Sequence, residues 1–325
     1  MEFILAIPRL FRLPNLLIVF LTQWIPYWIV LRPAILKSGA IPVLTEDSFT
    51  LITLNTVLIT LGGYLINDYF DKDIDAVNDP DRVIAGRLIP AVFFLYFYWL
   101  ILFATTLLSI RIYNLLPGPG MYWPLWVFPL VSGCLFLYAA FLKCTPLMGN
   151  LVVAILCAVV PVILLIPEDR PIWLGSFRDP GEIHQAVGLV WLYALFAFIT
   201  NLWREQVKDL EDFPGDAACK CATLPVVKGP RAARVPAGFT GLFASIMTLF
   251  LILFWSETLA PSWQIIAGYL LLLLPSLVAA AFVFFAKARK HHTIASVLIK
   301  VVMISGLFLL VRSWPSHFDL SSIHL

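Results

Sequence analysis

The chain has 325 residues, of which 61% are hydrophobic and 13% are charged, and its mean hydropathy is +0.90. This composition excludes an ordinary soluble globular domain and predicts an all-α, polytopic membrane helix bundle. The formal net charge of +2, without any block of like charges, excludes a basic arm for nucleic acid and favours membrane lipids as partners.

Nine apolar segments are long enough to cross a bilayer as helices of about 20 residues. The first, Leu13–Leu31, is too long for the hydrophobic region of a cleavable signal peptide and lacks a cleavage site, so we expect a membrane span. The others, in chain order, are Ser48–Asn67, Ile89–Ile110, Met121–Leu142, Asn150–Ile166, Ala186–Trp203, Val235–Trp255, Trp263–Ala286 and Ile294–Val311. No boundary interrupts them, so residues 1–325 are predicted to form a single transmembrane domain.

The distribution of Lys and Arg predicts the orientation of these spans. Fifteen of these residues fall on one set of alternating loops and six on the other. Because cytoplasmic loops carry the excess of positive charge, we expect the N-terminus in the cytoplasm of a cell or inner membrane. The ends of the second and sixth spans then face the cytoplasm together.

Two aspartate clusters with the spacing D-x2-D-x3-D occur at those two span ends. They are Asp68, Asp71 and Asp75, and Asp209, Asp212 and Asp216. Positions i, i+3 and i+7 share a helix face, so the first cluster is predicted to form one oxygen-rich surface beside Asn67, with Asp73 pointing away. Pro214 and Gly215 are predicted to break the second helix, so that Asp216 approaches from a loop.

Carboxylates this crowded repel one another unless a divalent cation neutralises them. Hard oxygen ligands suit Mg²⁺, which bridges carboxylates to phosphate oxygens, so the six aspartates are predicted to be catalytic metal ligands for a diphosphate. Cations on the same side of the membrane can bind that diphosphate: Arg82, Lys143, Arg204 and Lys208. Metal and cations would stabilise the leaving group of an allylic diphosphate, while the bundle keeps the remaining carbocation dry.

Two further features concern cysteine and an intramembrane charge. The five cysteines are too scattered for a disulfide framework and are expected to be structural: Cys134, Cys144, Cys157, Cys219 and Cys221. Lys300 falls several residues inside the ninth apolar segment. A functional role and a structural one, such as pairing with a neighbouring helix, are both open for it.

These motifs resemble those of the UbiA-type superfamily of intramembrane prenyltransferases. The match to N-D-x2-D-x3-D and the following I-D-x-x-N-x-P-x-R runs from Asn67 to Arg82, and the match to R-E-x2-K-D-x2-D-x2-G-D runs from Arg204 to Asp216. Two shorter matches are Y-x4-K at Tyr138 and Lys143 and the R-x-P-N pattern ending at Asn15. The resemblance implies a nine-helix bundle that binds Mg²⁺ and a prenyl diphosphate. The substrate-binding residues that it implies are Asn15, Asn67, Arg82, Tyr138, Lys143, Arg204 and Lys208.

Within the superfamily, the R-E-x2-K-D segment is most similar to the digeranylgeranylglyceryl phosphate synthase-like group. This resemblance implies transfer of a prenyl group, such as geranylgeranyl, to a lipophilic acceptor. A glycerol-phosphate ether lipid and an aromatic or quinone precursor are both open as acceptors. Pro214 and the segment Val83–Ala85 depart from the family pattern.

Three other functions use related features. A membrane terpene cyclase would ionise the same diphosphate without an acceptor. A CDP-alcohol phosphotransferase would carry a D-G-x2-A-R string, which this sequence lacks. A transporter would place its site near mid-membrane on broken helices, whereas these acids lie at span ends.

Overall fold

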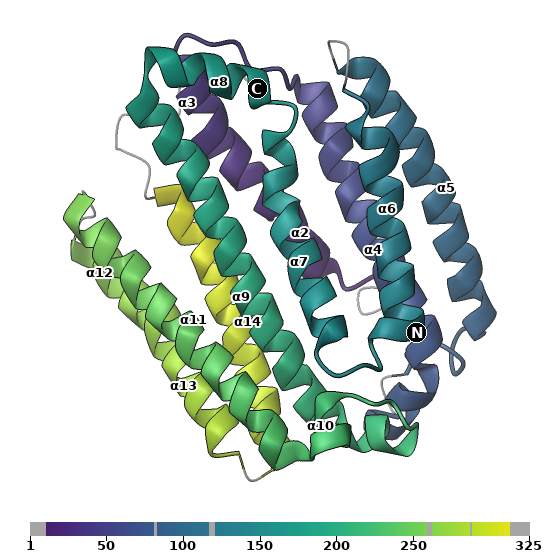
Figure 1. Cartoon of the computed structure of the whole chain (residues 1–325). Coiled ribbons are helices and arrows are strands. Elements are labelled where there is room, and N and C mark those ends of the chain that lie inside the picture. The colour runs from purple at the N-terminus through teal and green to yellow at the C-terminus, as the bar shows by residue number, and fades with distance from the viewer. Residues whose placement is uncertain (1–10, 81–82, 117–120, 259–261, 287, 313–325) are drawn as a thin grey trace.

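The computed structural model describes residues 11–80, 83–116, 121–258, 262–286 and 288–312. In these ranges the chain forms a bundle of long helices (Figure 1), and the only β-pairing is an isolated bridge between Ala85 and Ile89. Eight segments of the described chain are long and apolar enough to cross a membrane. The prediction of an all-α membrane bundle is therefore confirmed.

The helices follow the predicted apolar segments in order. Their bounds are α2 (Leu13–Ile25), η1 (Pro26–Leu31), α3 (Arg32–Lys37), α4 (Glu46–Asn78), α5 (Ala91–Leu115), α6 (Trp123–Leu137), η2 (Tyr138–Leu142), α7 (Met148–Val162), η3 (Ile163–Leu165), α8 (Asp169–Arg178), α9 (Pro180–Ala218), α10 (Leu224–Lys228), α11 (Pro230–Thr258), α12 (Ser262–Gly268), η4 (Tyr269–Leu273), α13 (Leu274–Phe284) and α14 (Arg289–Arg312). The predicted ninth span lies within α14, which is not among the eight segments. The side chains of residues 308–312 lie outside the described ones.

Helix α9 is central to the packing of the bundle. It contacts α4, α7, α11 and α14, and in Figure 1 it crosses the bundle between α7 and α11. Trp203 of α9 is fully buried, and a Cβ on Gly241 of α11 would lie 2.5 Å from its indole ring. Because only glycine leaves room for this ring, Gly241 lets the two helices approach closely.

The predicted helix break at Pro214 is wrong, since α9 continues through Pro214 to Ala218. Proline removes one backbone donor from a helix, and the distortion must be stabilised by other hydrogen bonds. Here Gly215 N donates to Asn78 Oδ1 at 2.9 Å, and the Glu211 carbonyl accepts from Arg289 Nε at 3.0 Å. Asp216 therefore approaches from the last turn of a helix.

The spacing of the cysteines indicated no disulfide, yet two of the five residues form one. Cys144 and Cys221 form a disulfide across a sequence separation of 77 residues, with Cα atoms 4.6 Å apart. Cys144 follows η2 and Cys221 follows α9. The disulfide therefore joins the two loops that come after Lys143 and Asp216. Cys134, Cys157 and Cys219 are free, as expected.

Glu168 is buried at the end of the bundle that lies away from the aspartate clusters, just before α8. Its fully buried carboxylate accepts hydrogen bonds from Tyr27 Oη at 2.9 Å, Val43 N at 2.9 Å and Leu44 N at 3.0 Å. Burial raises the pKa of Glu168 above its ordinary value, although these three donors oppose the shift. This anchor fixes the loop that precedes α4 and leaves the other end of the bundle for the aspartate clusters.

Candidate functional site

The two aspartate clusters come together because Asn78 links the last turn of α4 to the last turns of α9. Asn78 Nδ2 donates to the Asp212 carbonyl at 3.1 Å, and its Oδ1 accepts from Gly215 N at 2.9 Å. Asn78 lies one turn after Asp75, and Gly215 immediately precedes Asp216. The amide therefore fixes the first cluster relative to the second, although 134 positions separate Asn78 from Asp212.

The first cluster lies on a continuous helix, as predicted, because α4 runs to Asn78. Asp71 is its most buried member, at 3% exposure, and it accepts hydrogen bonds from Asn67 Nδ2 and Lys143 Nζ. Asp68 forms an ion pair with Arg12. Asp73, expected to point away, is exposed. Neighbouring cations thus balance part of the charge of this cluster.

The second cluster lies on the facing end of α9. Asp209 Oδ2 accepts from Asn150 Nδ2 at 2.9 Å, and Asp216 Oδ2 accepts from Thr223 Oγ1 at 3.0 Å. Asp216 is buried, with 2% exposure. These amide and hydroxyl donors orient the carboxylates without neutralising them.

The clusters also interact electrostatically. Asp75 interacts with Asp71 and Asp212, and Asp216 interacts with Asp212 and Asp71. Such repulsion favours a cation between the clusters, and carboxylate and amide oxygens are the donors that Mg²⁺ prefers. The donor set thus fits Mg²⁺ in its chemistry. In the part of the chain that the structure describes, no three His, Cys, Asp or Glu side chains gather closely enough to hold a metal ion by themselves.

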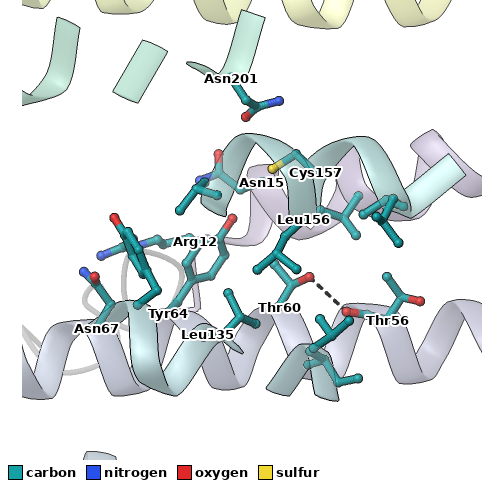
Figure 2. Close-up of a pocket in the computed structure, with 18 of the residues that line it drawn as sticks. Arg12, Asn15, Thr56, Thr60, Tyr64, Asn67, Leu135, Leu156, Cys157 and Asn201 are labelled. Atoms are coloured by element: carbon teal, nitrogen blue, oxygen red, sulfur yellow. Dashed lines mark hydrogen bonds between the residues drawn. The ribbon is translucent and has the colours of Figure 1, made fainter. Parts of the chain in front are cut away.

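A cavity of about 210 Å³ begins beside the first cluster and extends between α2, α4, α6, α7 and α9. Figure 2 shows Arg12, Tyr64 and Asn67 at one end of the view, with Thr56 and Leu156 toward the other. The polar end also includes Arg204, Glu205 and Lys208. The apolar part is lined by Ile59, Phe128, Val131, Leu135, Val153, Leu156, Val159, Val160 and Ile163. The cavity is therefore amphipathic, with charges near the aspartates and hydrocarbon walls deeper in the bundle.

Most of the predicted substrate-binding residues gather at this cavity. Its walls include Asn15, Asn67, Tyr138, Arg204 and Lys208. Lys143 instead contacts the first cluster through its ion pair with Asp71. Arg82 lies outside the described residues.

Arg12 was recognised in the sequence only as part of the pattern that ends at Asn15. In the structure its guanidinium pairs with Asp68, lies 4.8 Å from the centre of the Tyr64 ring and lines the cavity. Its backbone has a left-handed conformation, with φ of 47°. A non-glycine residue in this region is strained, and such strain concentrates at functional sites. Arg12 thus adds a positive charge to the site from outside both aspartate-rich motifs.

Arg289 is a second residue that the sequence motifs did not indicate. It stands at the start of α14 and donates from Nε to the Glu211 carbonyl at 3.0 Å and from a terminal nitrogen to the Asn78 carbonyl at 2.9 Å. One guanidinium therefore binds the ends of both α4 and α9. No spacing rule connects Arg289 to either motif, so only the fold reveals this contact.

We expect Arg289→Gln to lower the free energy of unfolding by about 1–3 kcal/mol, because two charged hydrogen bonds to carbonyl oxygens are lost. Unfolding in mixed micelles, followed by circular dichroism, measures the change. Lys290→Gln is the matched control, since Lys290 is an exposed neighbour on the same helix. Equal stability of the two variants would contradict a linking role for Arg289.

The chain resembles known proteins in both sequence and fold. The model of the UbiA prenyltransferase family matches residues 16–307. A digeranylgeranylglyceryl phosphate synthase from Methanospirillum hungatei is 32% identical over 228 residues, which cover 68% of this chain and 70% of that protein.

Two solved structures share the fold. One, from work on digeranylgeranylglyceryl phosphate synthase in membranes, has a TM-score of 0.57 at 19% identity and covers 96% of this chain and 100% of its own. The other is a UbiA homolog from Archaeoglobus fulgidus bound to GPP and Mg²⁺, with a TM-score of 0.50 at 15% identity, covering 94% of this chain and 99% of its own. Because the family model matches nearly the whole described chain, the protein belongs to the UbiA prenyltransferase family.

Proposed function

We propose that this protein transfers a geranylgeranyl group from its diphosphate to the hydroxyl of a glycerol-phosphate ether lipid. The observation that carries the proposal is the linkage of both aspartate clusters through Asn78, beside a cavity with a charged end and an apolar wall. A prenyl diphosphate matches this cavity, because its anionic head group suits the charged end and its hydrocarbon tail suits the apolar wall. The similarity to digeranylgeranylglyceryl phosphate synthases supports the choice of acceptor.

Asp68, Asp71, Asp75, Asp209, Asp212 and Asp216 would hold Mg²⁺, which would neutralise the diphosphate and make it a better leaving group. The Mg²⁺ bound with GPP in the Archaeoglobus fulgidus homolog supports this cofactor. Lys143, Arg204 and Lys208 place further positive charge near the same head group. Asn67 orients Asp71 through its amide.

In the reaction, the bond between C1 of the prenyl chain and the diphosphate oxygen breaks, and its electron pair leaves with the diphosphate. The acceptor hydroxyl oxygen forms the new bond to C1 and loses its proton to solvent or to the released diphosphate. The apolar walls, including Phe128, Leu135 and Leu156, surround the prenyl chain and exclude water from the cation. Exclusion of water favours the ether product over hydrolysis.

Purified protein in lipid nanodiscs, incubated with Mg²⁺, labelled geranylgeranyl diphosphate and geranylgeranylglyceryl phosphate, tests the proposal. We expect one labelled ether for each diphosphate released. Chelation of Mg²⁺ with EDTA should lower the rate at least about 100-fold, since metal charge supplies several kcal/mol to such steps, and added Mg²⁺ should restore it.

Three outcomes, the last with an aromatic acceptor added to the assay, would contradict the proposal in whole or in part. Undiminished transfer in EDTA would exclude the metal. Release of diphosphate without acceptor, together with a cyclised hydrocarbon, would make the protein a terpene cyclase instead. Transfer of label only to an aromatic acceptor would retain the prenyltransferase but replace the proposed acceptor.

A further inference from the structure

A second cavity, of about 120 Å³, adjoins the first one and lies between α2, α7, α9 and α14. The two cavities share part of their walls: Asn15, Val19, Tyr64, Cys157, Val160, Asn201 and Arg204. Arg204 can therefore reach both spaces. A molecule in the second cavity would lie next to the head-group end of the first.

The walls that belong to only one cavity differ in their charged groups. Those of the first include Arg12, Glu205 and Lys208 beside the aliphatic and aromatic residues named above. Those of the second are apolar at Ile18, Phe196, Ala197 and Met303. They also include Lys300, the Thr200 hydroxyl, and the hydroxyls of Thr22 and Tyr193, whose oxygens lie 3.4 Å apart. Apolar walls with a few hydroxyls and one ammonium group can hold a lipid and bind its polar part.

Lys300 provides the charge that is specific to the second cavity. It lies eleven residues after Arg289 on α14, which places it about 16 Å along the helix from that end. Within the described part of the chain, Lys300 has no hydrogen-bond or ion-pair partner. Its strongest interaction with a charged group is repulsion by Arg204, followed by attraction to Glu211 and repulsion by Lys208 and Arg12. Its side chain is exposed rather than buried, so an anion can reach it, and an anion beside two mutually repelling cations lowers their electrostatic energy.

Three other cations near the site already have ion-pair partners. Arg12 pairs with Asp68, Lys143 with Asp71, and Arg204 with Glu205 at 2.5 Å. In contrast, none of the described residues that line the second cavity is an Asp or a Glu. An anionic group placed between Lys300 and Arg204 would offset their repulsion. A phosphate monoester has this charge and enough oxygen acceptors for both side chains.

We infer that Lys300, together with Arg204, binds the phosphate of the acceptor lipid and makes the enzyme prefer phosphate-bearing acceptors. The inference rests on the proposed function, which requires a second substrate beside the prenyl diphosphate. The donor is assigned to the first cavity, and Lys300 does not line that cavity. Lys300 is therefore a determinant of acceptor specificity, separate from the machinery that ionises the donor.

Steady-state kinetics of Lys300→Met with two acceptors test this assignment. One acceptor is geranylgeranylglyceryl phosphate, and the other is the same ether lipid without its phosphate. We expect the KM for the phosphate-bearing acceptor to rise about 10- to 100-fold, as for the loss of a hydrogen bond to a charged group. The KM for geranylgeranyl diphosphate and the rate with the uncharged acceptor should stay within about twofold of the wild type. Lys300→Arg should restore most of the preference, because it keeps the positive charge.

Lys290→Met is the matched control, since it removes an exposed lysine from the same helix. Lys300→Gln provides a second uncharged variant, and the thermal midpoint of each protein shows that it is folded. A uniform loss of rate with both acceptors would overturn the inference in favour of a structural role. A raised KM for the prenyl diphosphate would overturn it in favour of donor binding. If wild-type protein transferred label to neither acceptor, the proposed function and this inference would fall together, whereas transfer unchanged by Lys300→Met would reject the inference alone.

Discussion

Replacement of Asp71 by Asn is expected to lower the rate of prenyl transfer about 100- to 1000-fold, the loss typical of removing one preorganised electrostatic group. Asp71 is the most buried acid of the first cluster, and its carboxylate accepts hydrogen bonds from Asn67 and Lys143. The substitution keeps the size of the side chain and removes its charge. It therefore takes away a proposed Mg²⁺ ligand and leaves Lys143 without its partner, with little change in packing.

Asp73→Asn is the control, because Asp73 stands two residues further along α4 and is exposed. Both variants lose one negative charge from the same turn of the helix, so a difference between them reports position rather than net charge. Initial rates at saturating Mg²⁺ and at several Mg²⁺ concentrations measure the effect. A wild-type rate for Asp71→Asn, or an equal loss in both variants, would remove Asp71 from the proposed metal site.

The positions of the helices could be predicted from the sequence because a bilayer imposes length and hydropathy on each span. The helical face of the first cluster could also be predicted, since it depends only on the 3.6-residue period. The parity of their spans placed both clusters on the same side of the membrane, which permitted them to meet. The contact that joins them, from Asn78 to Asp212 and Gly215, needs the packing of α4 against α9.

Two predictions made from local sequence were overturned by contacts with distant segments of the chain. Pro214 was expected to end a helix, but hydrogen bonds from Gly215 to Asn78 and from Arg289 to Glu211 support the helix beyond it. The cysteines looked scattered because Cys144 and Cys221 lie far apart in sequence, while the fold brings their Cα atoms to 4.6 Å. In both cases the partner comes from a segment that sequence spacing does not relate to the motif.

The Gly215→Ala variant should show how closely the two aspartate clusters must approach. A Cβ at this position would lie 2.5 Å from Asn78 Nδ2 and 2.7 Å from the Ile74 carbonyl oxygen, so α4 and α9 would have to separate. Because an error of about 1 Å in the position of reacting groups can cost about 100-fold in rate, we expect prenyl transfer to fall by roughly that factor. We also expect the variant to unfold more easily, by about 1–3 kcal/mol, because an overpacked contact is strained.

Gly188→Ala is the matched control for this variant. Gly188 lies on the same helix, α9, and a Cβ there would meet no atom within 4 Å. Alanine favours helix over glycine by about 1 kcal/mol, so this control should be as stable as the wild type or more stable, with an unchanged rate. Transfer rates and thermal midpoints of the two variants, measured side by side, separate a general effect of alanine in α9 from an effect of distance between the clusters. If Gly215→Ala were as active and as stable as Gly188→Ala, close contact between α4 and α9 at Asn78 would not be needed for catalysis.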